Sequence, residues 1–165
     1  MRILGIDPGI AIVGWGVVDF VNGRFRPVAY GAIRTAANTH TEDRLLAVYE
    51  ELDAIIEKYK PDSFALEELF WNTNQKTGII VAEARGVLLL CMRQNGLDIN
   101  EYTPLQIKQS VVGYGRAEKK QVIMMVTTFL GLKEAPKPDD TADALAIAIC
   151  HGHSSNSVMG QFYNK

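Results

Sequence analysis

The chain has 165 residues, of which 47% are hydrophobic and 22% charged, and its formal net charge is −2 at pH 7. These proportions exclude a disordered chain, and the length fits one domain with a sizeable core. The longest apolar run, near residues 86–92, is too short to span a bilayer, and the N-terminus reaches Asp7 too early for a secretory signal. Cys91 and Cys150 form no CxxC pair, so we expect two reduced, buried thiols in a cytoplasmic protein.

Positive charge is concentrated in the middle of the chain. Residues 76–137 carry nine Lys and Arg against five Asp and Glu, net +4, whereas residues 1–75 have net −4 and residues 138–165 net −2. A nuclease needs such cations beside an acidic pocket, because it must hold a phosphate backbone next to metal-binding carboxylates. On charge alone, ordinary solvated helix faces explain the pattern equally well.

The first third of the chain predicts an antiparallel meander of three strands. Residues 2–7 form a short apolar run that ends in an Asp-Pro-Gly turn, and residues 13–20 form a second strand. Asn22-Gly23 is a strong hairpin signal, and residues 24–35 then alternate as a third strand.

Helical spacing follows. Apolar residues recur at intervals of three and four from Leu45 to Tyr59, and Thr39-x-x-Glu42 is a candidate cap for this helix. A short apolar run over 63–67 predicts a buried strand, and a second helix is expected over 77–94.

Residues 98–102 predict the fifth strand. Thr103-Pro104 is typical of an N-cap followed by a first-turn proline, and it opens a short helix to about residue 111. Two further helices are expected, over 117–129 and from about 139 through ALAIAIC.

This order of elements predicts one α/β domain. A meander followed by alternating helices and strands gives a mixed five-stranded sheet, with three antiparallel strands plus two parallel strands, flanked by helices. We expect the domain to cover residues 1–153 and a short polar tail to cover 154–165.

Four acidic residues stand where a core-forming sequence would not place them. Asp7 ends the first strand and Glu67 ends the fourth, while Asp140 and Asp143 are three apart and share one face of the last helix. If the first and fourth strands are neighbours, all four carboxylates converge at one end of the sheet.

Such a cluster predicts a divalent metal site. Carboxylates packed together raise each other's pKa unless cations neutralise them, and all-oxygen ligation suits Mg²⁺ or Mn²⁺ rather than zinc. Two such ions ~4 Å apart can activate a water and stabilise the leaving oxygen of a phosphodiester.

Each acid also has an ordinary interpretation. A single Asp at a strand end is usually a turn residue, and Asp139, Asp140 and Asp143 would serve as a cap and as acids that suit the helix dipole. Glu68 is a rival to Glu67, since a strand places the two on opposite faces. His151 and His153 are two apart at a helix end, so we expect a solvated terminus there rather than a metal site.

As a set, five segments resemble the RuvC-type Holliday junction resolvases. They are GIDPG, ALEELF, EARGV, QIKQSVVGYGRAEKKQV and DDTADALAIAICHGH, and they occur in order from about residue 2 to residue 153. The resemblance implies a ribonuclease H-like fold, a homodimer formed through the helix at 77–94, and metal ligation by Asp7, Glu67, Asp140 and Asp143. It also implies that Lys108 and Lys119 lie near the scissile phosphate and that Phe70 stacks on bases.

The sequence departs from the family's pattern at two places. Trp71 follows Phe70, so either aromatic could meet the bases, and Ile10-Ala11-Ile12 is more apolar than the corresponding loop of the family. Arg116 and Lys76 are further candidates for DNA contact. A lysine at a helix start, as at Lys119, interacts unfavourably with the helix dipole. This small energetic cost is understandable if the helix start and the lysine together bind a phosphate.

The predicted function is therefore a Mg²⁺-dependent crossover junction endodeoxyribonuclease with one or two ions per site, Mn²⁺ substituting. It would make paired symmetric nicks in four-way DNA junctions, leaving 5′-phosphate and 3′-hydroxyl ends, in recombination and DNA repair. The expected partners are junction DNA, a second copy of the chain and a branch-migration helicase complex of the RuvA and RuvB type, with no membrane and no nucleotide cofactor. The alternative is a non-catalytic junction- or RNA-binding module on the same fold.

Overall fold

The computed structural model describes residues 1–68 and 75–155, which fold in the element order expected from the sequence. The strands are β1 (Arg2–Asp7), β2 (Ile12–Val21), β3 (Arg24–Arg34), β4 (Ser63–Glu67) and β5 (Ile99–Tyr102). The helices are α1 (Thr41–Tyr59), α2 (Gln75–Gln94), α3 (Pro104–Val112), α4 (Lys119–Phe129) and α5 (Asp139–Ser155). Within the described ranges, no helix combines the length and apolar character needed to cross a membrane.

The sheet is mixed, as predicted, with strand order β3-β2-β1-β4-β5. β1 to β3 pair antiparallel, whereas β4 pairs parallel with both β1 and β5. Ile6 of β1 lies opposite Leu66 of β4. Asp7 and Glu67, the next residue of each strand, therefore reach the same edge of the sheet.

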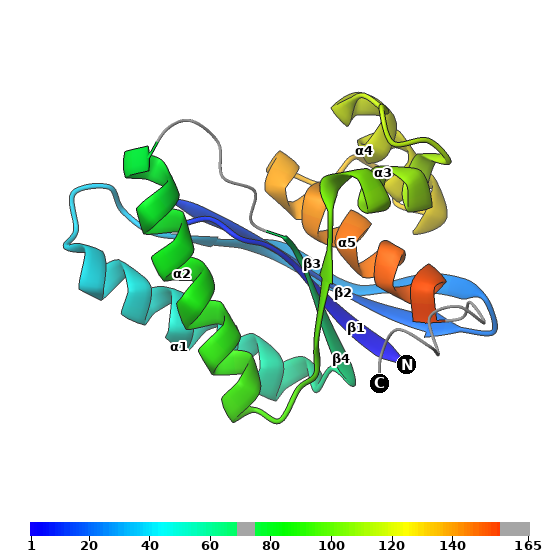
Figure 1. Ribbon diagram of the computed structural model, residues 1–165. Coiled ribbons are helices and arrows are strands. Elements are labelled where there is room, and N and C mark those ends of the chain that lie inside the picture. The colour runs from blue at the N-terminus through cyan, green and yellow to red at the C-terminus, as the bar shows by residue number, and fades with distance from the viewer. Residues whose placement is uncertain (69–74, 156–165) are drawn as a thin grey trace.

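Helices cover both faces of the sheet: α1 and α2 lie on one face and α3, α4 and α5 on the other (Figure 1). Because side chains alternate along a strand, β1 contributes to two cores. Leu4 and Ile6 are buried in the α1–α2 core, while Ile3 is buried in the core that contains α5. Cys91 and Cys150 are free, buried thiols, one in each core, as expected.

Helix α5 lies unusually close to β1 and β2, and two glycines allow this. A Cβ atom at Gly5 would overlap the backbone carbonyl of Ala144, and one at Gly14 would overlap the carbonyl of Asp140. Gly14 is paired with Asp7 across the β1–β2 ladder. The missing side chain at Gly14 therefore lets the start of α5 approach the end of β1, where Asp7 stands.

The local signals of the sequence are confirmed at two places and wrong at one. Asn22 and Gly23 both have positive φ, 53° and 74°, as a tight hairpin turn requires. The Thr103 hydroxyl accepts the Gln106 N–H at 3.1 Å, which confirms the predicted N-cap of α3. Thr39 does not cap α1: its own N–H donates to the Ala36 carbonyl in a preceding turn, and the N-cap is His40.

Candidate active site

The structure brings the four predicted acids together at one edge of the sheet. Asp7 and Glu67 end the adjacent strands β1 and β4, and Asp140 and Asp143 stand near the start of α5. The carboxylates of Asp143, Glu67 and Asp140 each act electrostatically on Asp7. The predicted convergence is therefore confirmed, while the roles of these residues remain a prediction.

These carboxyl groups hold their protons more tightly than free ones. Burial, followed by the charges of Asp143, Glu67 and Asp140, raises the pKa of Asp7 to about 8. Burial and the charge of Asp143 also raise the pKa of Glu67, and burial raises that of Asp143. Ionising these groups together would therefore leave uncompensated negative charge, so the site favours an added cation.

Lys119 supplies part of that compensation from the first residue of α4. Its ammonium Nζ lies 2.8 Å from Asp143 Oδ2 and 3.7 Å from Asp139 Oδ2. The hydrogen bond to Asp143 raises the pKa of Lys119, and the lysine in turn opposes the rise in the pKa of Asp143. Lys119 thus remains charged beside the acids.

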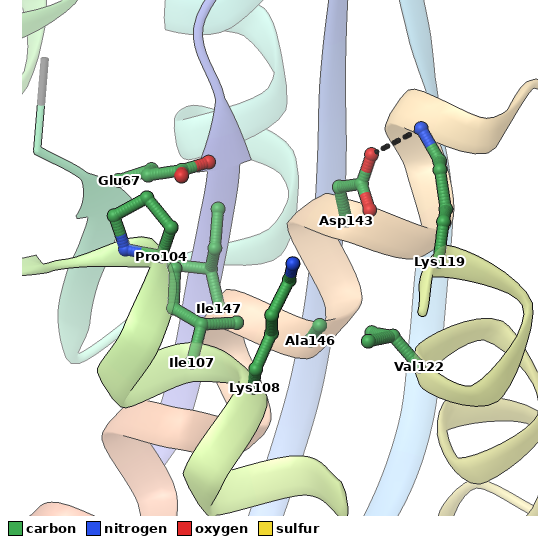
Figure 2. A pocket seen from close by; sticks show the side chains of 9 residues that line it. All are labelled: Glu67, Pro104, Ile107, Lys108, Lys119, Val122, Asp143, Ala146 and Ile147. Atoms are coloured by element: carbon green, nitrogen blue, oxygen red, sulfur yellow. Dashed lines mark ion pairs between the residues drawn. The ribbon is translucent and has the colours of Figure 1, made fainter. Parts of the chain in front are cut away.

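A cavity of about 260 Å³ lies between β4, α3, α4 and α5, and two of the four acids, Glu67 and Asp143, line it. Figure 2 shows Glu67 on one side, the Asp143–Lys119 ion pair on the other, and Lys108 rising from α3 between them. The apolar part of the wall comes from Pro104, Ile107, Val122, Ala146 and Ile147. The cavity therefore presents two carboxylates and two ammonium groups to whatever enters it.

The donor set fits a hard divalent cation by type and by charge. All four donors are carboxylates, which Mg²⁺ and Mn²⁺ prefer, and the raised pKa values of three of them favour added positive charge. Within residues 1–68 and 75–155, no three Asp, Glu, His or Cys side chains are arranged to hold a metal ion as they stand. The ammonium of Lys119 is bound to Asp143, so this lysine and the carboxylates must rearrange around an entering ion.

The other predicted site residues have different positions. Arg116 is exposed in the loop between α3 and α4. Lys76 belongs to the first turn of α2, but its side chain is outside the described part of the chain, as are Phe70 and Trp71. Glu68, the rival of Glu67, is not among the charges that act on Asp7, and its backbone N–H donates to the Tyr102 carbonyl at 2.9 Å. Glu67 is therefore the better candidate of the pair.

The two histidines of α5 correct the expectation of a solvated helix end. His151 is only 4% exposed, and its Nδ1 lies 2.7 Å from the Tyr102 hydroxyl. His153 Nδ1 lies 3.0 Å from the Ser110 hydroxyl. α5 packs against β5 and α3 to its end, so its last turns are covered, and burial lowers the pKa of His151 to about 4.

Sequence reasoning also missed a set of contacts on the loop that follows Asp7. The Thr35 hydroxyl donates to the Ile10 carbonyl at 2.5 Å, and Arg44 Nε donates to the same hydroxyl at 2.8 Å. One Thr and one Arg nine residues apart give no periodic or motif signal, so only the fold shows that they meet.

Known proteins resemble this chain over nearly its whole length. The family model for crossover junction endodeoxyribonuclease RuvC matches residues 3–151. The RuvC of Clostridioides difficile is 57% identical over 155 residues, which cover 94% of this chain and 92% of that protein. The RuvC of Caldanaerobacter subterraneus subsp. tengcongensis is 56% identical over 165 residues and all of both chains.

Solved structures agree with these sequence relatives. Thermus thermophilus RuvC in complex with a Holliday junction substrate superposes with a TM-score of 0.89 at 33% identity, covering 94% of each chain. The yeast mitochondrial Holliday junction resolvase Ydc2, at 13% identity and a TM-score of 0.68 over 98% of this chain and 84% of that one, shares the fold. The chain belongs to the family of crossover junction endodeoxyribonucleases RuvC.

Proposed function

We propose that this chain is a metal-dependent endonuclease that resolves four-way DNA (Holliday) junctions. It would make paired symmetric nicks that leave 5′-phosphate and 3′-hydroxyl ends, in homologous recombination and DNA repair. The observation that carries the proposal is the convergence of Asp7, Glu67, Asp140 and Asp143 at one sheet edge, with raised pKa values on three of them, in a member of this family.

Asp7, Glu67, Asp140 and Asp143 would hold the metal, which we propose to be Mg²⁺ with Mn²⁺ as a substitute, as one or two ions. Bound there, such ions would supply Lewis-acid activation of a water and stabilisation of the departing 3′ oxygen. The carboxylates themselves would set where the positive charge is held. No nucleophilic side chain and no nucleotide cofactor is required.

Lys119 and Lys108 would bind the phosphate. Both line the cavity that contains Glu67 and Asp143, and Lys119 stands at the start of α4, where the helix dipole also favours an anion. We propose that Arg116, in the adjacent loop, and Lys76, in the first turn of α2, contact the DNA backbone. Phe70 or Trp71 would stack on bases near the crossover.

A homodimer would present two such sites to one junction, and we propose that it forms through α2. Ile79 and Leu90 of this helix are 54% and 56% exposed, and their spacing of three turns places them on one face. The opposite face of α2 buries Leu88 and Met92 in the core. The outer apolar face is thus available to a second copy.

The remaining partners follow from the substrate. We propose that residues 1–153 act as one catalytic domain with a short tail, in the cytoplasm with the chromosome. A branch-migration helicase complex of the RuvA and RuvB type would deliver the junction. Selectivity would come from junction shape and dimer geometry more than from base contacts.

The test compares the wild type with Asp7→Asn on a labelled four-way junction in Mg²⁺. The substitution should abolish cutting, a loss of at least about a hundredfold, because it removes a ligand charge at the reacting centre. It should leave junction binding in Ca²⁺ intact or stronger, since a negative charge beside phosphate is lost. Glu68→Gln is the matched control and should cut normally.

Two results would count against the proposal. Unchanged cutting by Asp7→Asn would remove the acid cluster from the mechanism. Tight junction binding by the wild type without cutting, under any divalent ion, would favour the non-catalytic binding module, which no comparison with known proteins supports.

A further inference from the structure

We propose that Arg44 and Thr35 act as positioning residues for Asp7, by clamping the loop that follows it. This inference rests on the proposed cleavage reaction. The loop, residues 8–11, leaves the sheet at Asp7 and returns as β2. Its backbone is held by Thr35, which directly follows β3. Thr35 is in turn held by Arg44, in the first turn of α1. In the strand order, β3 lies on the other side of β2 from β1 and β4, the strands that end in Asp7 and Glu67.

Thr35 holds two successive carbonyl groups of the loop. Its hydroxyl donates to Ile10 O at 2.5 Å, and its backbone N–H donates to Ala11 O at 3.1 Å. The second bond extends the β2–β3 ladder by one step beyond the pair of Ile12 and Arg34. The loop is therefore fixed by a side chain as well as by the sheet.

Arg44 fixes the direction of the Thr35 hydroxyl. A hydroxyl has one proton, and here that proton is directed to the Ile10 carbonyl. Arg44 Nε donates a hydrogen bond to the oxygen of this hydroxyl, at 2.8 Å. The Thr35 side chain therefore cannot rotate without losing a charge-assisted hydrogen bond. Each bond in this chain strengthens the other.

The clamp matters because the loop that it holds follows Asp7 directly. Asp7 must keep its place beside Asp143, Glu67 and Asp140. A loop whose backbone is held limits how far the end of β1 can move. The cation that lowers the pKa of Asp7 is Lys119, on the other side of the site, and Arg44 is not among the charges that act on it. Arg44 therefore acts through the loop backbone rather than through its charge.

The experiment uses single-turnover cutting of a four-way junction in Mg²⁺ and junction affinity in Ca²⁺. Thr35→Val removes the hydroxyl at nearly constant shape, and Arg44→Met removes the donor but keeps an apolar stem. Each should slow cutting by about tenfold to a hundredfold, since a small displacement of a reacting group has that effect. Junction affinity should stay within about twofold of the wild type, because neither residue would touch DNA.

Two further variants separate positioning from folding. Thr35→Ser keeps the hydroxyl and should cut at close to the wild-type rate. The double variant Thr35→Val with Arg44→Met should be no slower than Thr35→Val alone, because both changes break one chain of bonds. Amide hydrogen exchange of the metal-free protein over residues 8–13 should become several-fold faster in Thr35→Val and Arg44→Met, and not in Thr35→Ser.

Wild-type cutting rates in both single variants would overturn the clamp, as would additive losses in the double variant. Loss of junction affinity in Arg44→Met alone would also overturn it, and would make Arg44 a direct phosphate contact. If the wild type itself cuts nothing, the proposed function fails, and hydrogen exchange alone then decides whether the clamp exists.

Discussion

Asp7 lies half-buried at a strand end beside three other acids, and its chemistry follows from that position. Burial and the charges of Asp143, Glu67 and Asp140 act in the same direction on its carboxyl group, and only Lys119 opposes them. A carboxyl with a pKa of about 8 exchanges its proton for a metal ion near neutral pH. When ionised, such a group destabilises the metal-free fold, and the same repulsion favours the binding of a metal ion.

Asp7→Asn should therefore stabilise the metal-free protein in a pH-dependent way. The pKa of Asp7 is about 8 in the folded chain against an ordinary value of 3.8 for an aspartate. As pH rises from about 4 to about 8, the unfolded chain loses this proton and the folded chain keeps it, so the wild type loses stability. The loss is on the order of a few kcal/mol.

Thermal unfolding in EDTA across this pH range measures the effect. The melting temperature of Asp7→Asn should exceed that of the wild type at pH 8 and approach it near pH 4. Glu68→Gln, at a neighbouring carboxylate outside the cluster, should show no such widening gap. A gap for Asp7→Asn that is constant with pH would contradict the assigned electrostatics.

At the scale of elements, the site depends on the close crossing of α5 over β1 and β2. Gly14 should not tolerate a larger residue, because a Cβ atom there would overlap the backbone of Asp140, which has no freedom to move away. We expect Gly14→Ala to cost about 1–3 kcal/mol, the usual effect of overpacking, and to displace the acids of α5.

Gly115→Ala is the matched control for Gly14→Ala. A Cβ atom at Gly115 would meet the side chain of Leu105, which is 57% exposed and can turn aside. Chemical denaturation of both variants, together with junction cutting, measures the difference. Equal stability of the two would show that the α5 crossing is not constrained at Gly14.

Much of this architecture is predictable from the sequence. The hairpin at Asn22-Gly23, the cap at Thr103 and the order of elements follow from local rules. Asp7 and Glu67 stand out because each ends an apolar run, and Asp140 and Asp143 because they share one face of the last helix. The sequence alone did not predict that β1 pairs with β4. The convergence of Asp7 and Glu67 was therefore expected only if these two strands were neighbours, as the structure shows them to be.

What the sequence could not show depends on contacts between distant residues. The Lys119–Asp143 bond, the burial of His151 under Tyr102 and the Arg44–Thr35 chain join positions 24, 49 and 9 residues apart. A glycine in a strand pattern does not reveal whether a helix backbone lies on it, as at Gly14. The cap predicted at Thr39 was wrong because α1 begins at Thr41, which makes His40 the N-cap.

At the scale of the whole molecule, the acidic site lies at one edge of the sheet, while α2 presents an apolar outer face. Leu90→Lys should weaken the proposed homodimer, because it places a charge on that face. Leu46→Lys is the matched control: Leu46 is 55% exposed on α1, close to the 56% of Leu90. Sedimentation at several protein concentrations should show dissociation for Leu90→Lys only.

If the homodimer dissociates in both lysine variants, or in neither, the dimer contact lies elsewhere than on the outer face of α2. Junction cutting adds a second measurement, since paired nicks require two linked sites. Leu90→Lys should produce single nicks more often than the wild type at the same protein concentration.

The most direct test of the account incubates the wild-type protein with a labelled four-way junction and with a linear duplex of the same sequence, in Mg²⁺ or in EDTA. The account predicts paired nicks at symmetry-related positions on the junction only, and only with Mg²⁺. Cutting in EDTA, or cutting of the duplex as fast as the junction, would contradict it.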